Sequence, residues 1–185
     1  AAIPLKPRLF EAIVGAAVSS SGDVPVTVKF RKGTADDPLT YLEAGRIAEA
    51  GGAAAVSLHA RTAEQLYSGH ADWTAVAELK AAVTSIPVFS NGDVWEPWDA
   101  LRLMRDTGCD GVVVGRGCLG RPWLFGDLAP VFGRSPASGG SEPDEPPDLG
   151  DVAVAMARPA RLLVDWSGPH GIRDFRKHTA WYLKG

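Results

Sequence analysis

Apolar residues gather in four short runs along the chain. The runs are VPVTVKF, AAAVSLH, IPVFS and DGVVVG, at residues 24–30, 53–59, 86–90 and 110–115. A strand with one face in water alternates apolar and polar residues, whereas a strand buried on both faces is apolar almost throughout, as in parallel sheets. The four runs therefore predict strands of a parallel sheet.

Helical patterns occupy the segments between these runs. Residues 39–50 are rich in helix formers and end at Gly51-Gly52, a frequent kind of C-cap. A second helix is predicted behind Asp72, a suitable N-cap, because apolar residues recur there at helical spacing. These residues are Trp73, Val76, Leu79 and Val83. A third helix is predicted from Pro97, with Trp98, Leu101 and Met104 on one face.

The alternation of strand and helix, with a period of roughly 30 residues, predicts an α/β fold built from βαβ units. Residues 133–151 are rich in proline, glycine and acidic residues and predict a flexible linker. Two further helices are predicted beyond it, at 152–166 and 172–183. The expected domains are therefore residues 1–132, a linker at 133–151, and a helical segment at 152–185.

Composition narrows the class of protein. The 185 residues carry a formal net charge of -3, so any contact with RNA must come from a local basic patch. The chain has no apolar run of membrane-spanning length, and its start does not resemble a signal peptide. Cys109 and Cys118 are too few for a disulfide framework or a zinc site. We expect a cytoplasmic protein with reduced thiols, no metal and no membrane partner.

Polar residues follow each predicted strand. The segments that carry them are KFR, HART, SNGD and GRGCLGRPW, at residues 29–31, 59–62, 90–93 and 115–123. Because ligands of parallel α/β folds bind at the carboxyl ends of the strands, these groups are expected at one rim. The glycines of the last segment allow backbone amides to approach an anion, and Arg116 supplies charge. SNGD and GRG together predict a phosphate cradle.

Five segments in this order resemble the tRNA-dihydrouridine synthases, most closely their bacterial DusB-like branch. They are PVTVKFRKG, SLHARTAEQLYSGHADW, IPVFSNGDV, TGCDGVVVGRGCLGRPWLF and FRKHTAWYLKG. The resemblance implies the second half of a (β/α)₈ barrel followed by the start of a helical, tRNA-binding domain. It also implies FMN as cofactor, NADPH as reductant and tRNA as partner, in an enzyme that reduces the C5–C6 double bond of uridine and is a monomer at full length.

The resemblance also assigns residues, with these roles as expectations. Lys29 corresponds to the lysine that faces the flavin ring, and His59 to the histidine at the flavin edge. Asn91, Gly92 and Asp93 correspond to the segment that lines the ribityl chain and phosphate. A further set corresponds to phosphate and RNA contacts. It comprises Gly115 and Arg116 for the phosphate, and Arg61, Arg176, Lys177 and His178 for RNA or substrate.

One family motif is absent. The family's catalytic cysteine lies in an N-x-G-C-P-like motif after the fourth barrel strand, and these 185 residues contain no such motif. Cys109 precedes a predicted buried strand and Cys118 lies beside the GRG segment, so neither replaces it. We therefore expect the chain to begin inside a longer protein, with the catalytic cysteine outside it, and to be inactive alone.

Simpler interpretations of the same residues stay open. Lys29 also suits the surface end of a strand, His59 a hydrogen-bonded strand end, and SNGD an ordinary turn. Arg61 and Tyr67 could pin the long loop before Asp72, and the FRKH basic residues could be a solvated helix face. Two other functions also remain. One is an FMN-dependent barrel oxidoreductase that acts on a small molecule, and the other is a non-enzymatic truncated product.

Overall fold

The structure is a computed structural model that describes residues 3–132 and 147–183. The chain divides into two compact units, residues 1–94 with 99–114 and residues 95–98 with 115–185. Of the predicted linker, residues 133–146 lie outside the described residues. Its last three residues belong to a helix, because α6 (Leu149–Ser167) begins three residues before the predicted start. The predicted domain boundaries stay predictions.

The first unit is built on a parallel sheet. Its strands are β1 (Thr27–Arg31), β2 (Ala55–His59), β3 (Val88–Asn91) and β4 (Gly111–Val113). They pair side by side in the order β1-β2-β3-β4, and each pair is parallel. The predicted α/β fold is confirmed, and four parallel strands alternating with helices are consistent with part of a (β/α)₈ barrel.

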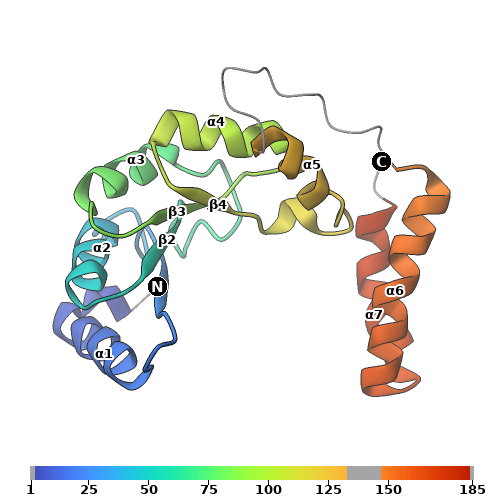
Figure 1. Ribbon diagram of the computed structural model, residues 1–185, viewed down its shortest axis with the longest axis horizontal. Coiled ribbons are helices and arrows are strands. Elements are labelled where there is room, and N and C mark those ends of the chain that lie inside the picture. Colours follow the sequence, from blue (N-terminus) through green and yellow to red (C-terminus); the bar gives the residue numbers. More distant parts are fainter. Residues whose placement is uncertain (1–2, 133–146, 184–185) are drawn as a thin grey trace. The chain divides into compact units, whose positions relative to one another are not determined.

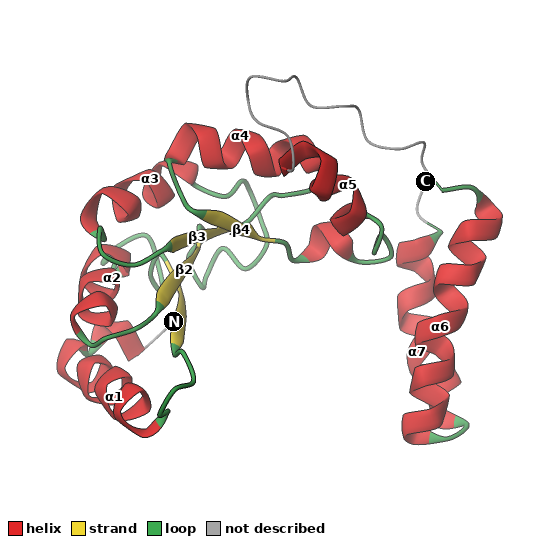
Figure 2. Cartoon of the chain, in the orientation of Figure 1, coloured by secondary structure: helices red, strands yellow, loops and turns green. Residues whose placement is uncertain are grey.

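Three helices connect the strands and cover one face of the sheet (Figures 1 and 2). They are α2 (Tyr41–Ala50), α3 (Trp73–Ala82) and α4 (Pro97–Thr107). The side chains that face this layer come from alternate strand positions and are the most deeply buried of the unit. Val56, Leu58 and Val88 are completely inaccessible to solvent. Burying such a side chain contributes about 1.5–3 kcal/mol, so this layer is the core.

Helix α3 begins as its sequence predicts. The Asp72 carboxylate accepts hydrogen bonds from the backbone amides of Thr74 and Ala75, at 3.1 and 3.4 Å. The predicted apolar positions Val76 and Leu79 are fully buried. An N-cap of this kind contributes about 1 kcal/mol, which explains why the helix starts immediately after the capping residue.

Helix α4 turns a different face to the core from the predicted one. Its buried residues are Pro97, Ala100, Leu103 and Thr107, whereas Trp98 is 38% exposed. Thr107 can lie on the buried face of α4 because its hydroxyl donates a hydrogen bond to the Leu103 carbonyl at 2.7 Å. Sequence alone favoured the larger apolar side chains, and a backbone-bonded threonine takes the core position instead.

One helix of the first unit is not predicted by the sequence analysis. Helix α1 (Pro7–Ser20) follows a short 3₁₀ turn, η1 (Ile3–Leu5), and begins at a proline, which suits a first helical position. It buries Phe10 and Val14. Val14 packs closely on Gly51 after α2, where a Cβ atom would lie 2.8 Å from the Val14 Cγ1 atom.

The second unit is helical. It contains the 3₁₀ turn η2 (Arg116–Cys118), α5 (Leu124–Phe132), α6 and α7 (His170–Tyr182). Helices α6 and α7 form a hairpin that is closest at Gly171, where a Cβ atom would lie 2.3 Å from the Leu163 carbonyl. Within the described segments, no helix combines the length and apolar character that a membrane span requires.

Candidate functional site

The face of the sheet opposite the helices carries three of the predicted site residues of the first unit. Strand register aligns Arg31, His59 and Asn91 in one row across β1, β2 and β3. Lys29 lies two residues before Arg31, so it projects from the same face in the next row. We call this side of the sheet the open face. Lys29, His59 and Asn91 are therefore brought together near the carboxyl ends of three adjacent strands.

Two cations share the end of β1. Lys29 is exposed and Arg31 is half-buried on the open face. Partial burial, and then the positive charge of Arg31, lower the pKa of the Lys29 ammonium from its ordinary value. A bound anion would offset both effects, because a nearby negative charge favours the charged form of the ammonium. The end of β1 is thus electrostatically suited to a negatively charged ligand.

The row that contains Lys29 includes two residues that the sequence analysis missed. Ser57 of β2 aligns with Lys29, and Phe89 of β3 aligns with Ser57. The Ser57 hydroxyl is buried and has no hydrogen-bond partner among the described residues. The Phe89 ring extends over Gly111 of β4, since a Cβ atom there would lie 2.8 Å from the ring. Ser57 lies two residues before His59, and Phe89 lies two residues before Asn91, so each pair shares one face of its strand. This spacing is the signal that could have identified Ser57 and Phe89.

The SNGD segment forms a tight turn at the end of β3. Gly92 has φ of 135° and Asp93 has φ of 55°, both in regions that favour glycine. A Cβ atom on Gly92 would lie 2.8 Å from the Ala71 Cβ. The Asn91 side chain donates to the Val113 carbonyl at 2.7 Å, which ties the turn to β4. Glycine at position 92 therefore allows the loop that precedes α3 to pack closely against the turn.

Arg61 and Asp93, predicted separately for RNA and for FMN, bind one another. The Arg61 Nη2 atom donates to both Asp93 carboxylate oxygens, at 2.8 and 2.9 Å. Arg61 also donates to the carbonyls of Ser68 and Gly69, and its side chain is 1% exposed. Asp93 further accepts the Ala71 amide at 2.6 Å. This geometry favours the simpler interpretation, in which Arg61 pins the loop before Asp72.

Gly115 and Arg116 lie in the second unit, and their phosphate role stays a prediction. Arg116 opens η2, and its guanidinium carbon lies 5.2 Å from the centre of the Trp95 ring. Gly120, one of the glycines predicted to let backbone amides approach an anion, packs against α7. Its φ is 71°, and a Cβ atom there would lie 2.2 Å from the Trp181 carbonyl carbon. Gly120 is therefore the contact of this segment with α7.

The three α7 residues that were predicted for RNA make different contacts. Arg176 and Lys177 are exposed, and Lys177 forms a surface ion pair with Asp174 at 3.2 Å. His178 stacks on Phe175 with ring centres 6.3 Å apart. It lines an apolar groove of about 570 Å³ together with Tyr182, Trp166 and Cys118. All three side chains are thus exposed, and His178 also lines the groove.

Neither cysteine is a residue of the open face. Cys109 is buried before β4, and its thiol contacts the Gly111 carbonyl at 3.4 Å. The Cys118 thiol donates to the Gly115 carbonyl at 3.1 Å in the second unit. Across residues 3–132 and 147–183, no three His, Cys, Asp or Glu side chains gather as a metal site requires.

Comparison with known proteins agrees with the five sequence segments. The family model described as dihydrouridine synthase (Dus) matches residues 1–185. The chain is 57% identical to a probable tRNA-dihydrouridine synthase of Mycobacterium tuberculosis (strain ATCC 25618 / H37Rv), over all of this chain and 47% of that protein. It is 40% identical to tRNA-dihydrouridine synthase B of Xanthomonas campestris, over 96% of this chain and 50% of that protein.

The matches differ in how much of each protein they cover. The chain spans about half the length of the curated relatives it matches. The match to the family nevertheless extends from the first residue to the last, across both compact units. The resemblance stated from the motifs is confirmed, and the chain belongs to the dihydrouridine synthase (Dus) family.

Proposed function

We propose that this chain supplies the flavin-holding strands of a tRNA-dihydrouridine synthase. The whole enzyme would bind FMN, take reducing equivalents from NADPH in the cytoplasm, and reduce the C5–C6 double bond of a uridine in tRNA. The observation that carries the proposal is the open face, where Lys29, His59 and Asn91 lie together at the carboxyl ends of parallel strands. Family membership supports the choice of FMN and tRNA over other ligands.

The residues of the open face fit a flavin in three respects. The two cations of β1 suit the negative charge of a reduced flavin ring. The orphaned Ser57 hydroxyl needs a polar partner, and a bound ligand with carbonyl or hydroxyl groups provides one. The Phe89 ring offers a flat apolar surface over Gly111. When bound, FMN supplies the hydride chemistry.

Within this proposal the residues of the chain bind and orient. Lys29 would hold its ammonium near the electron-rich part of a bound flavin ring, and the negative charge of the ligand would raise the lowered pKa of Lys29 toward its ordinary value. His59 is buried, so its imidazole is held in one orientation at the ring edge. Asn91 is held by the hydrogen bond that its side-chain amide donates to the Val113 carbonyl, and its side-chain oxygen could accept a hydrogen bond from a ligand.

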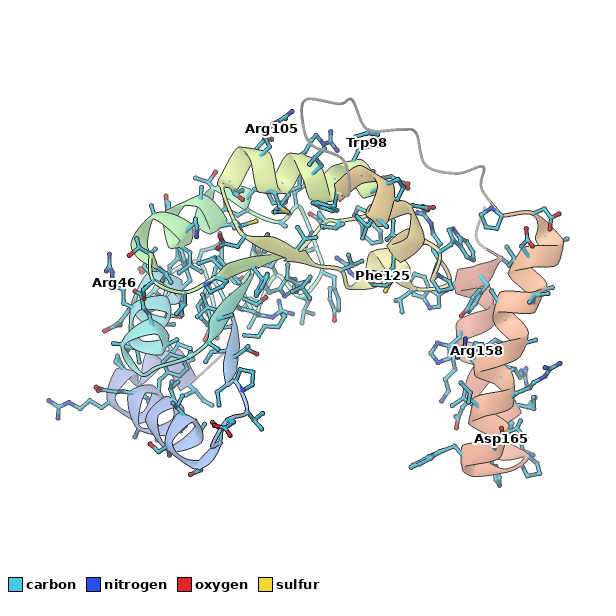
Figure 3. All side chains as sticks on the ribbon, in the orientation of Figure 1. Arg46, Trp98, Arg105, Phe125, Arg158 and Asp165 are labelled. Atoms are coloured by element: carbon cyan, nitrogen blue, oxygen red, sulfur yellow. The ribbon has the colours of Figure 1, made fainter. Side chains whose placement is uncertain are left out.

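Replacing Lys29 by alanine is expected to weaken FMN binding roughly tenfold, the effect of losing one charge-assisted contact of about 1.5 kcal/mol. Titration of the purified whole enzyme with FMN, followed by flavin fluorescence, measures this change. Arg46→Ala is the matched control because Arg46 is an exposed cation on α2 and projects away from the sheet (Figure 3). A preparation of the whole enzyme that stays colourless after incubation with FMN contradicts the proposed function.

We also expect the 185-residue chain alone to reduce no uridine. By resemblance, a cysteine thiol protonates C5, and the N-x-G-C-P-like motif that carries it is absent from these residues. The two cysteines present contact backbone carbonyls instead. Incubation of the chain with FMN, NADPH and an unmodified tRNA transcript, followed by mass analysis of nucleosides, measures dihydrouridine. Any turnover by this chain would show that another group donates the proton.

A further inference from the structure

The loop that joins β2 to α3 presents two large side chains to solvent. It follows His59, so it leaves the sheet at the same edge as the candidate site. Leu66 is 64% exposed and Tyr67 is 59% exposed, one after the other at the tip of the loop. We call these two residues the loop tip. Neighbouring apolar side chains exposed beside a candidate site call for a physical reason.

Two buried or half-buried arginines hold the loop tip in place. Arg31, from the open face, donates to the carbonyls of Thr62 and Leu66 at 2.7 and 3.2 Å. Arg61 donates to the carbonyls of Ser68 and Gly69 on the other side of the tip, at 3.2 and 2.7 Å. The loop tip is therefore fixed from both sides, and one of its anchors belongs to the row of candidate site residues.

Hydrogen bonds inside the loop add to this order. The Thr62 amide donates to the Gln65 side-chain oxygen at 2.8 Å, and the Gln65 amide donates to the Thr62 hydroxyl at 3.2 Å. Leu66 nevertheless has φ of 50°, a left-handed conformation that costs a residue with a Cβ atom about 1–2 kcal/mol. Strain of this kind persists where the surroundings impose it, and it clusters at ligand-binding segments.

We propose that the loop tip is a contact for an unstacked nucleobase of the RNA substrate, with the Tyr67 ring as the stacking surface. The inference rests on the proposed function, which supplies an RNA whose target uridine must leave its stack to react. An aromatic ring held on an ordered loop suits this task, because stacking on a base loses little side-chain freedom and tolerates any base. Leu66 extends the apolar surface next to the ring.

Binding of an unmodified tRNA transcript to the purified chain tests the proposal. Tyr67→Ala is expected to weaken binding about tenfold, within the range for losing one stacked base, and Tyr67→Phe to keep it within about twofold. Leu9→Ala is the matched control, since Leu9 is 47% exposed on α1 and lies outside the candidate site. Circular dichroism verifies that each variant is folded.

A second measurement locates the contact directly. A transcript with 5-bromouridine in place of uridine is irradiated with the chain, and the cross-linked peptide is identified by mass spectrometry. The expected peptide contains Tyr67, and the cross-link is lost in Tyr67→Ala. Tyr67→Ala binding equal to that of the unchanged chain, with cross-links elsewhere, would overturn the inference.

A third variant separates this inference from the proposed function. Arg176→Ala combined with Lys177→Ala removes two exposed cations of α7 and should weaken RNA binding through lost phosphate contacts. If this variant binds more weakly while Tyr67→Ala does not, RNA binding stands and the loop tip has no part in it. If the unchanged chain binds no tRNA, the same variants are compared in the whole enzyme, and absence of tRNA binding there refutes both the proposed function and the inference.

Discussion

Replacing Arg61 by alanine is expected to lower the free energy of unfolding of the first unit by about 3–5 kcal/mol, the usual effect of breaking a buried ion pair. Arg61 is 1% exposed, and its guanidinium joins Asp93 to two carbonyls of the loop before α3. The variant leaves the Asp93 carboxylate, which is only 16% exposed, next to the Ala71 amide but without the positive charge of the guanidinium. Denaturant unfolding monitored by circular dichroism measures the loss.

The matched control is Arg105→Ala. Arg105 is 72% exposed on α4 and pairs with Asp106 at 2.9 Å, so its removal should change the free energy of unfolding by less than about 1 kcal/mol. Arg105 also projects away from the sheet (Figure 3). Asp93→Ala alone, and Asp93→Ala combined with Arg61→Ala, complete a double-mutant cycle that isolates the interaction of Arg61 with Asp93. Equal effects of the two arginine variants would mean that Arg61 does not anchor the loop.

Replacing Gly120 by alanine is expected to release α7 from the segment that follows η2. The new Cβ atom would lie 2.2 Å from the Trp181 carbonyl carbon, which is backbone and has no freedom to rotate away. The φ of 71° adds left-handed strain of about 1–2 kcal/mol, and overpacking adds about 1–3 kcal/mol. Hydrogen exchange of the α7 amides should accelerate, because the C-terminal turn of the helix loses its packing partner.

Gly126→Ala provides the control for this change within the same unit. Gly126 lies in α5, and a Cβ atom there would meet no atom within 4 Å. Alanine is favoured over glycine in a helix interior by roughly 0.5–1 kcal/mol, so this variant should be equally or more stable. Unchanged exchange of the α7 amides in Gly120→Ala would show that Gly120 does not approach Trp181 in solution.

The fold of the first unit is largely predictable because its signals are local. Runs of apolar residues predict all four strands, and Asp72 predicts the start of α3 from its own side chain. Helix α1 was not predicted, and it begins close to two prolines, Pro4 and Pro7, a residue type that breaks a helix when it lies in the interior. Pro7 in fact takes the first helical position, where the missing amide costs nothing.

The candidate site is predictable only in part, because its decisive contacts join distant residues. Lys29, His59 and Asn91 follow from strand ends, and the register then brings them to one face. Arg61 and Asp93 are 32 positions apart, and no local pattern indicates that each is the partner of the other. Their pairing depends on the close packing of the SNGD turn against Ala71. The sequence of neither segment alone predicts this packing.

Gly111 has a consequence for how members of this family diverge. The Phe89 ring fills the space that a side chain at position 111 would need, so the two positions share one volume on the open face. A larger residue at 111 requires a smaller one at 89, and a substitution at either site alone would tilt the ring or push the strands apart. Across homologues, sizes at these two positions should covary inversely, and an ancestral change at one should precede or follow its compensation at the other.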